Sequence, residues 1–532
     1  MRKTSLFQNP LAFWAGSLFV TLGVLAHVPM FLMGRHTHWQ MVGMPMSWEM
    51  WTGMAMIPLG LLLAWWGLLP PATSSAAGPA SHRLFHVADG VPLNQEHWKL
   101  VLVLIVTLAI DVMKPATLGF VMPGMGAEYA IPHTRASLLA LVALTGTTIG
   151  SLVWGRIADR IGRRAAILLS ALMFIGTAIC GAMPSFGWNL AMCFLMGASA
   201  GGLLPITFTL MAETVPARQR GWLLVALGGV GTSAGYLIAA GSAAVLEPMF
   251  SWRILWLLGL PTGAIIVFLN RFIPESPRFL AAMGRHLDAA RVLHRFAGKR
   301  HGLESDDDEH PGATVIDEGH PVVGVRELLR GAHARITLAL VVCGIGWGLV
   351  NFGFLLWLPT NLKLLGIDPA AASTLLARSA ILALPGIVPV ILLYQRWSSY
   401  RSLVLFIAAT ALALGAFALL DFFEVRDATL TSAVTAALLI SVSGVIAMLV
   451  PYAAEIYPVH LRGSGSGTVA GSSKFGGILG AALAWFGFFD HFLLSAVLLA
   501  VPMLASALML WRSGVETRGI GLEDIQTAMS QH

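Results

Sequence analysis

Charged residues occur inside apolar stretches of this chain, where a charge needs a partner or a water-filled cavity. Asp111 lies near the middle of the apolar run 98–121, and Lys114 follows three residues later on the same helix face. A charge at the bilayer centre costs roughly 2.5–3.5 kcal/mol on insertion scales. Pro115 lacks the N–H that would bond the Asp111 carbonyl, which predicts a bend beside the carboxylate. We expect Asp111 and Lys114 to bind a proton or a substrate; a neutralised pair that holds helices in register is the alternative.

Lys474 is the other basic residue deep within an apolar run, and three small residues precede it. Small residues let helices approach closely, so this lysine can face a cavity between helices. It could attract an anionic substrate or pair with Asp111. Trp347 and Asn351, in an earlier run, offer hydrogen bonds and an aromatic wall. Because Lys114 and Lys474 outnumber Asp111, these residues favour an anionic substrate.

The composition places these charges in a membrane protein. The chain has 532 residues, of which 56% are hydrophobic and 11% charged, against roughly 25% charged in an ordinary soluble domain. Lipid must be its main solvent, and the partners we expect are the bilayer, protons and a small-molecule substrate. The net charge of +6 is spread over short loops, which argues against nucleic-acid binding. The three cysteines lie in apolar runs without a C-x-x-C pair, so we expect no disulfide, metal site or organic cofactor.

Fourteen apolar runs are long enough to span a bilayer, and each is predicted to be a helix because hydrocarbon offers backbone groups no other partner. Basic residues gather in the loops on one side, which predicts that this side and both termini are cytoplasmic. The predicted class is an all-α membrane protein with this organisation: two extra N-terminal transmembrane helices in 1–75, a cytoplasmic linker in 76–97, an N-terminal six-helix bundle in 98–272, a central cytoplasmic linker in 273–334, a C-terminal six-helix bundle in 335–511 and a cytoplasmic tail in 512–532.

The two groups of six runs carry a repeated motif. AETVPARQRG at 212–221 and AEIYPVHLRG at 454–463 both fit A-E-x-x-P-x-x-x-R-G. A weaker pair keeps nearly the same spacing, with Glu275 in PESPRFL and Glu516 in VETRGIGLEDI. A membrane protein built from two similar halves places its substrate path between them. The repeat therefore favours transport, and we predict that the protein is not an enzyme.

A third motif, GRIADRIGRR at 155–164, lies between the second and third runs of the first six. It resembles the G-x-x-x-D-R-x-G-R-R loop of the major facilitator superfamily. The repeated segments and the two glutamate motifs resemble that superfamily's sugar-porter, organic-anion and synaptic-vesicle-glycoprotein branches. The resemblance implies a twelve-helix fold of two six-helix bundles that rock about a central cavity. It also implies a cytoplasmic gate, with these residues as candidates: Gly155, Asp159, Arg160, Gly162, Arg163, Arg164, Glu213, Arg220, Glu455 and Arg462.

The residues of these motifs suit a gate. Gly155 and Gly162 permit a tight connection between helices. Two acid–base pairs could form equivalent clusters on the two halves: Glu213 with Arg220, and Glu455 with Arg462. Single exposed pairs contribute only about 0–1 kcal/mol, so a gate needs a network; static loop anchors are the alternative. The second half departs from the family pattern, because YQRWSSYR at 394–401 lacks the acid and the glycines.

The first two runs are rich in methionine. Eight of the 23 methionines cluster there, with three histidines among them: Met30, Met33, Met41, Met44, Met46, Met50, Met54, Met56, His27, His36 and His38. Thioether and imidazole groups bind soft ions such as Cu(I), so a copper or other soft-metal transporter is one alternative function. Apolar packing also explains methionine here. In the central linker, we expect the acidic run 304–309 to be solvated rather than metal-binding.

Secondary active transport of a small organic solute, an organic anion or other metabolite, is the function these observations favour. We predict alternating access with proton-coupled symport. The residues predicted to bind the substrate or the proton are Asp111, Lys114, Lys474, Asn351 and Trp347. We expect a monomer that crosses the cell membrane many times, the inner membrane in a bacterium. A non-transporting sensor on a transporter scaffold is a second alternative.

Overall fold

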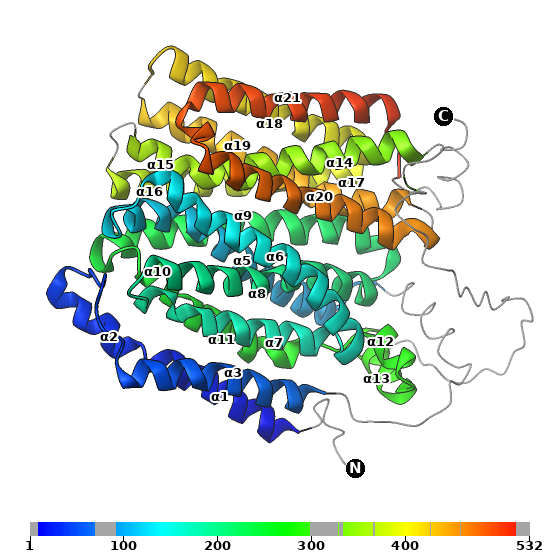
Figure 1. The fold of residues 1–532 in the computed structure, drawn as a ribbon. Helices are drawn as coiled ribbons and strands as arrows, with labels where there is room; N and C mark the ends of the chain where they lie inside the picture. Colours follow the sequence, from blue (N-terminus) through cyan, green and yellow to red (C-terminus); the bar gives the residue numbers. More distant parts are fainter. Residues whose placement is uncertain are drawn as a thin grey trace, which may run out of the picture.

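The computed structural model describes residues 9–69, 92–297, 328, 333–364, 368–425, 427–457 and 459–517. Within these ranges the chain is helical and contains no strand. Thirteen helical segments of this part are long and apolar enough to span a bilayer. The long helices run roughly parallel to one another across the molecule (Figure 1). These observations confirm the predicted all-α membrane fold.

The first bundle contains six spanning segments. They are α5 Gln95–Glu128, α6 His133–Ile161, α7 Arg163–Gly176 continued by η2 Thr177–Ala182, α8 Phe186–Thr214, α9 Ala217–Phe250, and α10 Ile254–Leu257 with α11 Gly259–Leu269 and η3 Asn270–Phe272. α5 begins at a capping box, in which the Asn94 side chain accepts from the His97 N–H and the His97 side chain accepts from the Asn94 N–H. Pro115 lies inside α5, so the Asp111 carbonyl lacks its helical donor, as predicted.

The second bundle contains the other six. They are α14 His333–Leu349 with η5 Val350–Leu355 and α15 Leu356–Leu364, α16 Pro369–Ala383 with η6 Leu384–Gly386 and α17 Ile387–Arg396, α18 Ser399–Phe422, α19 Ala428–Ile456, α20 Val459–Trp485, and α21 Phe492–Ser513 preceded by η7 Phe488–Asp490. α20 corresponds to one of the fourteen predicted apolar runs. It is not among the thirteen segments, and several side chains near its start lie outside the described part. η5 is a π-helical segment within the first of these spans.

The two extra helices form a hairpin on one side of the first bundle, next to α7 (Figure 1). The hairpin comprises α1 Pro10–Leu25, α2 Val28–Met33, η1 Gly34–Thr37 and α3 Trp48–Leu68. A methyl group added at Gly53 of α3 would lie 2.6 Å from the Gly23 carbonyl of α1, so glycine permits this close crossing. The Met41 N–H donates to Glu128 at 2.8 Å, and Glu128 forms a buried ion pair with Arg253 at 2.7 Å. These contacts fix the hairpin to the first bundle.

The central polar stretch contains two short helices, α12 Pro277–Ala282 and α13 His286–Ala297. Within the stretch predicted to be the central linker, α13 buries Ala289, Leu293 and Phe296. Arg295 of α13 pairs with Glu96 of α5 at 2.6 Å. The apolar residues recur at helical spacing, which explains why this part packs against the first bundle. The acidic run 304–309 lies outside the described residues.

Candidate functional site

A cavity of about 150 Å³ lies between the two bundles, and its wall is mostly apolar. Both bundles contribute to it. Four of the five residues predicted to bind substrate or proton line this cavity: Asp111 from α5, Trp347 from α14, Asn351 from η5 and Lys474 from α20. The sequence repeat predicted a substrate path between the halves, and the structure has a cavity there.

Among the described residues, Asp111 and Lys474 are the two charged side chains in the cavity wall. Asp111 is 5% exposed, and its Oδ1 has no hydrogen-bond partner within the described part of the chain. Lys474 Nζ donates to Ser151 Oγ and weakly, at 3.5 Å, to the Thr147 carbonyl. Among the described residues, no carboxylate oxygen lies within 4 Å of this ammonium. The site thus holds an acid and a base that share a cavity without forming an ion pair.

Lys114 lies outside the cavity wall, although the sequence suggested that it shares a helix face with Asp111. It is 2% exposed, and its Nζ donates to the Phe174 carbonyl and to Thr177 Oγ1, both at 2.9 Å. The same ammonium lies 3.5 Å from the centroid of the Phe174 ring. The structure therefore brings Lys114 to the junction of α7 and η2, inside the first bundle, and not to Asp111.

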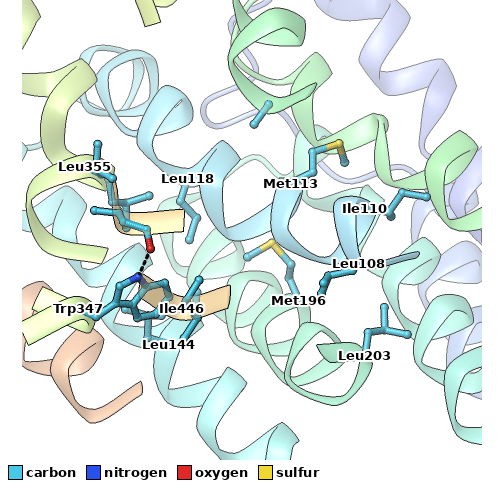
Figure 2. Packing of buried hydrophobic residues seen from close by; sticks show 14 of the residues in the cluster. Leu108, Ile110, Met113, Leu118, Leu144, Met196, Leu203, Trp347, Leu355 and Ile446 are labelled. Atoms are coloured by element: carbon cyan, nitrogen blue, oxygen red, sulfur yellow. Dashed lines mark hydrogen bonds between the residues drawn. The ribbon is translucent and has the colours of Figure 1, made fainter. Parts of the chain in front are cut away.

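Trp347 and Asn351 extend the cavity wall into the second bundle. The Trp347 indole N–H donates to the Val442 carbonyl at 2.8 Å, which holds the ring against α19. Figure 2 shows this bond, with Leu144 and Ile446 close to the ring. Asn351 lies one turn further along, in η5. π-Helical turns often occur at functional sites, because the extra residue changes the direction of the side chains.

Sequence reasoning missed several polar residues around this site, and three of them bear on its chemistry. Thr147 and Tyr236 line the cavity, and Ser151 binds Lys474 from α6. The Tyr236 hydroxyl is buried without a hydrogen-bond partner in the described part of the chain. A usable signal was present in the sequence, since Thr147 and Ser151 are four residues apart in an apolar run and so share one helix face.

The candidate gating loop of the first half is built around Glu275. Its carboxylate accepts from the backbone N–H of Arg163 at 2.7 Å and of Arg164 at 3.4 Å, which satisfies the free donors at the start of α7. Burial raises the pKa of Glu275, and these N–H bonds oppose that rise. Gly162 has φ +104°, and a methyl group there would collide with the Glu275 carboxylate. Gly155 differs from our expectation, because a methyl group added there would meet nothing within 4 Å.

Arg163 links the remaining acids of this loop. It contacts Asp159 at 3.3 Å and Glu213 at 3.5 Å. The sequence suggested that Glu213 pairs with Arg220, whereas the ion pair that the structure gives Glu213 is with Arg163. The other predicted gating residues have these positions: Arg220 donates to the Val215 carbonyl at 3.4 Å, Arg164 donates to Asn270 at 2.6 Å, and Arg160 is exposed.

The corresponding part of the second half uses hydroxyl groups. Glu455 accepts from the Tyr394 hydroxyl at 3.0 Å and from Thr517 Oγ1 at 2.6 Å. Glu516 accepts from the Ser399 N–H at 2.9 Å and from its hydroxyl at 2.7 Å. The side chain of Arg462, the predicted partner of Glu455, lies outside the described residues.

The methionine-rich hairpin has a pocket of its own. This pocket of about 260 Å³ is lined by Met30, Met33 and Met44, with Glu49 at its wall, and shares no lining residue with the central cavity. Among the described residues, no three His, Cys, Asp or Glu side chains gather in a way that could hold a metal ion. The three cysteines are buried and form no disulfide bond.

These features define a multi-pass membrane protein with two helical bundles around a central cavity. The sequence profile of the Major Facilitator Superfamily matches residues 100–481, and the chain belongs to this family. It is 28% identical to the niacin transporter NiaP of Acinetobacter baylyi, over 82% of this chain and 98% of that protein. It is also 28% identical to the 4-hydroxybenzoate transporter PcaK of the same organism, over 75% and 86%. The solved xylose transporter XylE from E. coli has the same fold, with a TM-score of 0.64, 14% identity and coverage of 80% and 100%.

Proposed function

We propose that this protein is a secondary active transporter that carries a small organic anion together with protons. The observation that supports this most is the pair Asp111 and Lys474, which share one cavity between the two bundles without an ion pair. A buried carboxylate oxygen without a partner is costly, so it favours a proton or a ligand. An ammonium held only by neutral acceptors is available to a stronger one.

The proposed substrate is a carboxylated ring compound. The relatives described above are named for niacin and 4-hydroxybenzoate, and each of these compounds joins one carboxylate to a flat ring. The cavity offers matching chemistry, with one ammonium in a mostly apolar wall that includes Trp347 and Phe352. Pockets of this kind bind through apolar contact and take their specificity from a few polar groups.

In the proposed cycle, Lys474 attracts the carboxylate and Asp111 carries the proton. A protonated Asp111 removes one negative charge from the cavity, which makes it less costly for an anion to enter. The two bundles then rock around the filled cavity, and the proton and the anion leave on the other side. We further propose that the loop networks at Arg163 and Glu455 lie on the cytoplasmic side with both termini, and that the protein works as a monomer in the inner membrane of a bacterium.

The test is uptake of nicotinate and 4-hydroxybenzoate into proteoliposomes with an imposed pH gradient. We expect Asp111→Asn to abolish gradient-driven uptake while substrate exchange without a gradient continues, because asparagine fits the site but cannot carry the proton. Asp421→Asn makes the same substitution outside the cavity wall and should transport as the wild type does. Gradient-driven uptake that survives in Asp111→Asn would contradict the assignment.

A further inference from the structure

We infer that the contact of Lys474 with Ser151 and Thr147 is a latch between the two bundles, which holds the empty carrier closed and which an anion releases. The inference rests on the proposed function for the identity of the anion, but the latch itself follows from the contacts. Lys474 lies on α20 of the second bundle, and both acceptors lie on α6 of the first. α6 and α20 pack against each other, so this bond joins two parts that must separate during transport.

The acceptors on α6 are arranged to hold an ammonium in an empty cavity. The Ser151 hydroxyl donates to the Thr147 carbonyl at 2.8 Å, which leaves its oxygen free to accept from Lys474. The Thr147 carbonyl lies 3.5 Å from the same Nζ. Both acceptors are neutral, and Asp111 in the same cavity wall forms no ion pair with Lys474 among the described residues, so the buried ammonium takes its hydrogen bonds from α6. The latch therefore satisfies Lys474 in the absence of substrate.

A carboxylate that enters the cavity competes with these neutral acceptors. Thr147 and Lys474 both line the cavity wall, so an anion can reach the ammonium from inside. Hydrogen bonds between two charged groups are roughly twice as strong as neutral ones, so the anion draws Lys474 away from Ser151. Because the bond to Ser151 exists only while the bundles are in contact at α6 and α20, its loss favours their separation. Ser151 is then a positioning residue that does not need to touch the substrate.

A second polar contact between the bundles shows why we expect the anion to act at Lys474. Lys363 of α15 donates to the Pro123 carbonyl of α5 at 3.2 Å, which is a second cross-bundle bond away from the cavity wall. Neither Lys363 nor Pro123 lines the cavity, so we expect this bond not to respond to substrate. Lys474 differs because its ammonium faces both the opposite bundle and the cavity.

The experiment measures the distance between spin labels on the full-length protein in nanodiscs. Labels are attached at Arg156→Cys and Gly467→Cys, which are exposed positions on α6 and α20. Gly467 has open space for a side chain, and the three native cysteines are buried. Without substrate, we expect Ser151→Ala to shift the ratio of separated to closed bundles by on the order of tenfold, the usual effect of losing a hydrogen bond to a charge. Ser137→Ala, a matched change on α6 outside the cavity wall, removes a hydroxyl that donates to the Thr134 carbonyl and should leave the ratio unchanged.

The same measurement is made on a second Ser151 variant and in the presence of substrate. Ser151→Thr keeps the hydroxyl and should restore the closed population, which separates the latch from a packing defect. Saturating 4-hydroxybenzoate should shift the wild type as Ser151→Ala does, whereas Lys474→Gln should be shifted already and should not respond. An unchanged ratio in Ser151→Ala overturns the latch, and an equal response of Lys474→Gln and the wild type overturns its release by the anion. If the wild type neither binds nor transports any carboxylate, the proposed function fails while the substrate-free comparison still decides the latch.

Discussion

The third helix of each bundle begins in a different way, although the two halves share a repeat. In the first half, Glu275 caps the start of α7 by accepting from the N–H groups of Arg163 and Arg164. In the second half, Glu516 caps the start of α18 by accepting from the N–H and the hydroxyl of Ser399. Each half therefore has a glutamate after its sixth helix, but the two glutamates bind different groups.

The second acid of each half shows the same contrast. Glu213 pairs with the Arg163 guanidinium, whereas Glu455 accepts from the hydroxyl groups of Tyr394 and Thr517. Glu275 and Glu516 recur in the two halves beside a helix start, where free N–H groups attract an anion whatever the neighbouring side chains are. The first half adds arginine charge to this arrangement, and the described part of the second half adds hydroxyl groups.

The largest expected effect comes from the backbone conformation at the start of α7, with the start of α18 as the comparison. Gly162 precedes α7 with φ +104° and ψ 159°, a conformation that is almost restricted to glycine, and its added methyl group would displace Glu275. Ser398 precedes α18 in ordinary extended conformation and accepts from the Arg401 N–H at 3.2 Å. We expect Gly162→Ala to lower the free energy of unfolding by about 3 kcal/mol or more. Thermal unfolding in detergent would measure the change.

Ser398→Ala is the matched substitution in the second half. It removes one N-cap bond and should cost about 1 kcal/mol. Equal destabilisation by the two alanines would show that the unusual backbone of Gly162 carries no special role, and would remove the main structural difference between the two helix starts.

The next prediction concerns the pH dependence of stability that arises from Glu275 in the first half. Burial raises the pKa of Glu275 above its ordinary value of 4.5, so above that value the folded protein holds more protons at this site than the unfolded chain. Stability contributed by this site therefore falls as pH rises from 4.5 through the raised pKa of the folded state. We expect Glu275→Gln to flatten this part of the profile, because glutamine does not titrate. The measurement is Tm against pH for both proteins.

Glu516→Gln provides the comparison with the second half. The same profile recorded on this variant shows whether the flattening is particular to the first half. A Glu275→Gln profile that keeps the full slope of the wild type would mean that other groups cause the pH dependence, and the contrast between the two capping acids would lose its electrostatic part.

The sequence predicted the fold well because a helix that crosses a bilayer must be one continuous apolar segment of sufficient length. Length, apolarity and loop charge placed the spans, and the repeated motifs placed the pseudo-equivalent loops. The same reasoning placed Asp111 and Lys474 inside the bilayer, where the structure finds them in one cavity. A charged residue is costly among lipid tails and must face a cavity or a partner, so its position in an apolar run indicates its depth in the membrane.

The sequence could not show the direction in which each charged side chain points. Lys114 is three residues from Asp111, yet it leaves the cavity because the change from α7 to η2 offers it the Phe174 carbonyl. The π-helical turn at Asn351 and the bond from Lys474 to Ser151 also depend on how neighbouring helices pack. The partner predicted for Glu213 differs from the observed one for a related reason. Glu213 pairs with Arg163 across the bundle, and a residue close in sequence was the only candidate that the motif suggested.

The smallest expected effect tests the hydroxyl groups of the second half. Tyr394→Phe removes the bond to Glu455 and keeps the ring in place, while Thr517 Oγ1 still donates at 2.6 Å. We expect a loss of about 0.5–1.5 kcal/mol, the net contribution of one hydrogen bond. The matched change Thr517→Val removes the other donor, and a double-mutant cycle read from unfolding midpoints measures how the two are coupled. If both hydroxyl groups serve to hold Glu455, the double variant loses more than the sum of the single losses, because only then does the half-buried carboxylate lose both of these donors. Strict additivity would instead mean that other groups hold Glu455, which would bring the second half closer to the charge-based arrangement of the first.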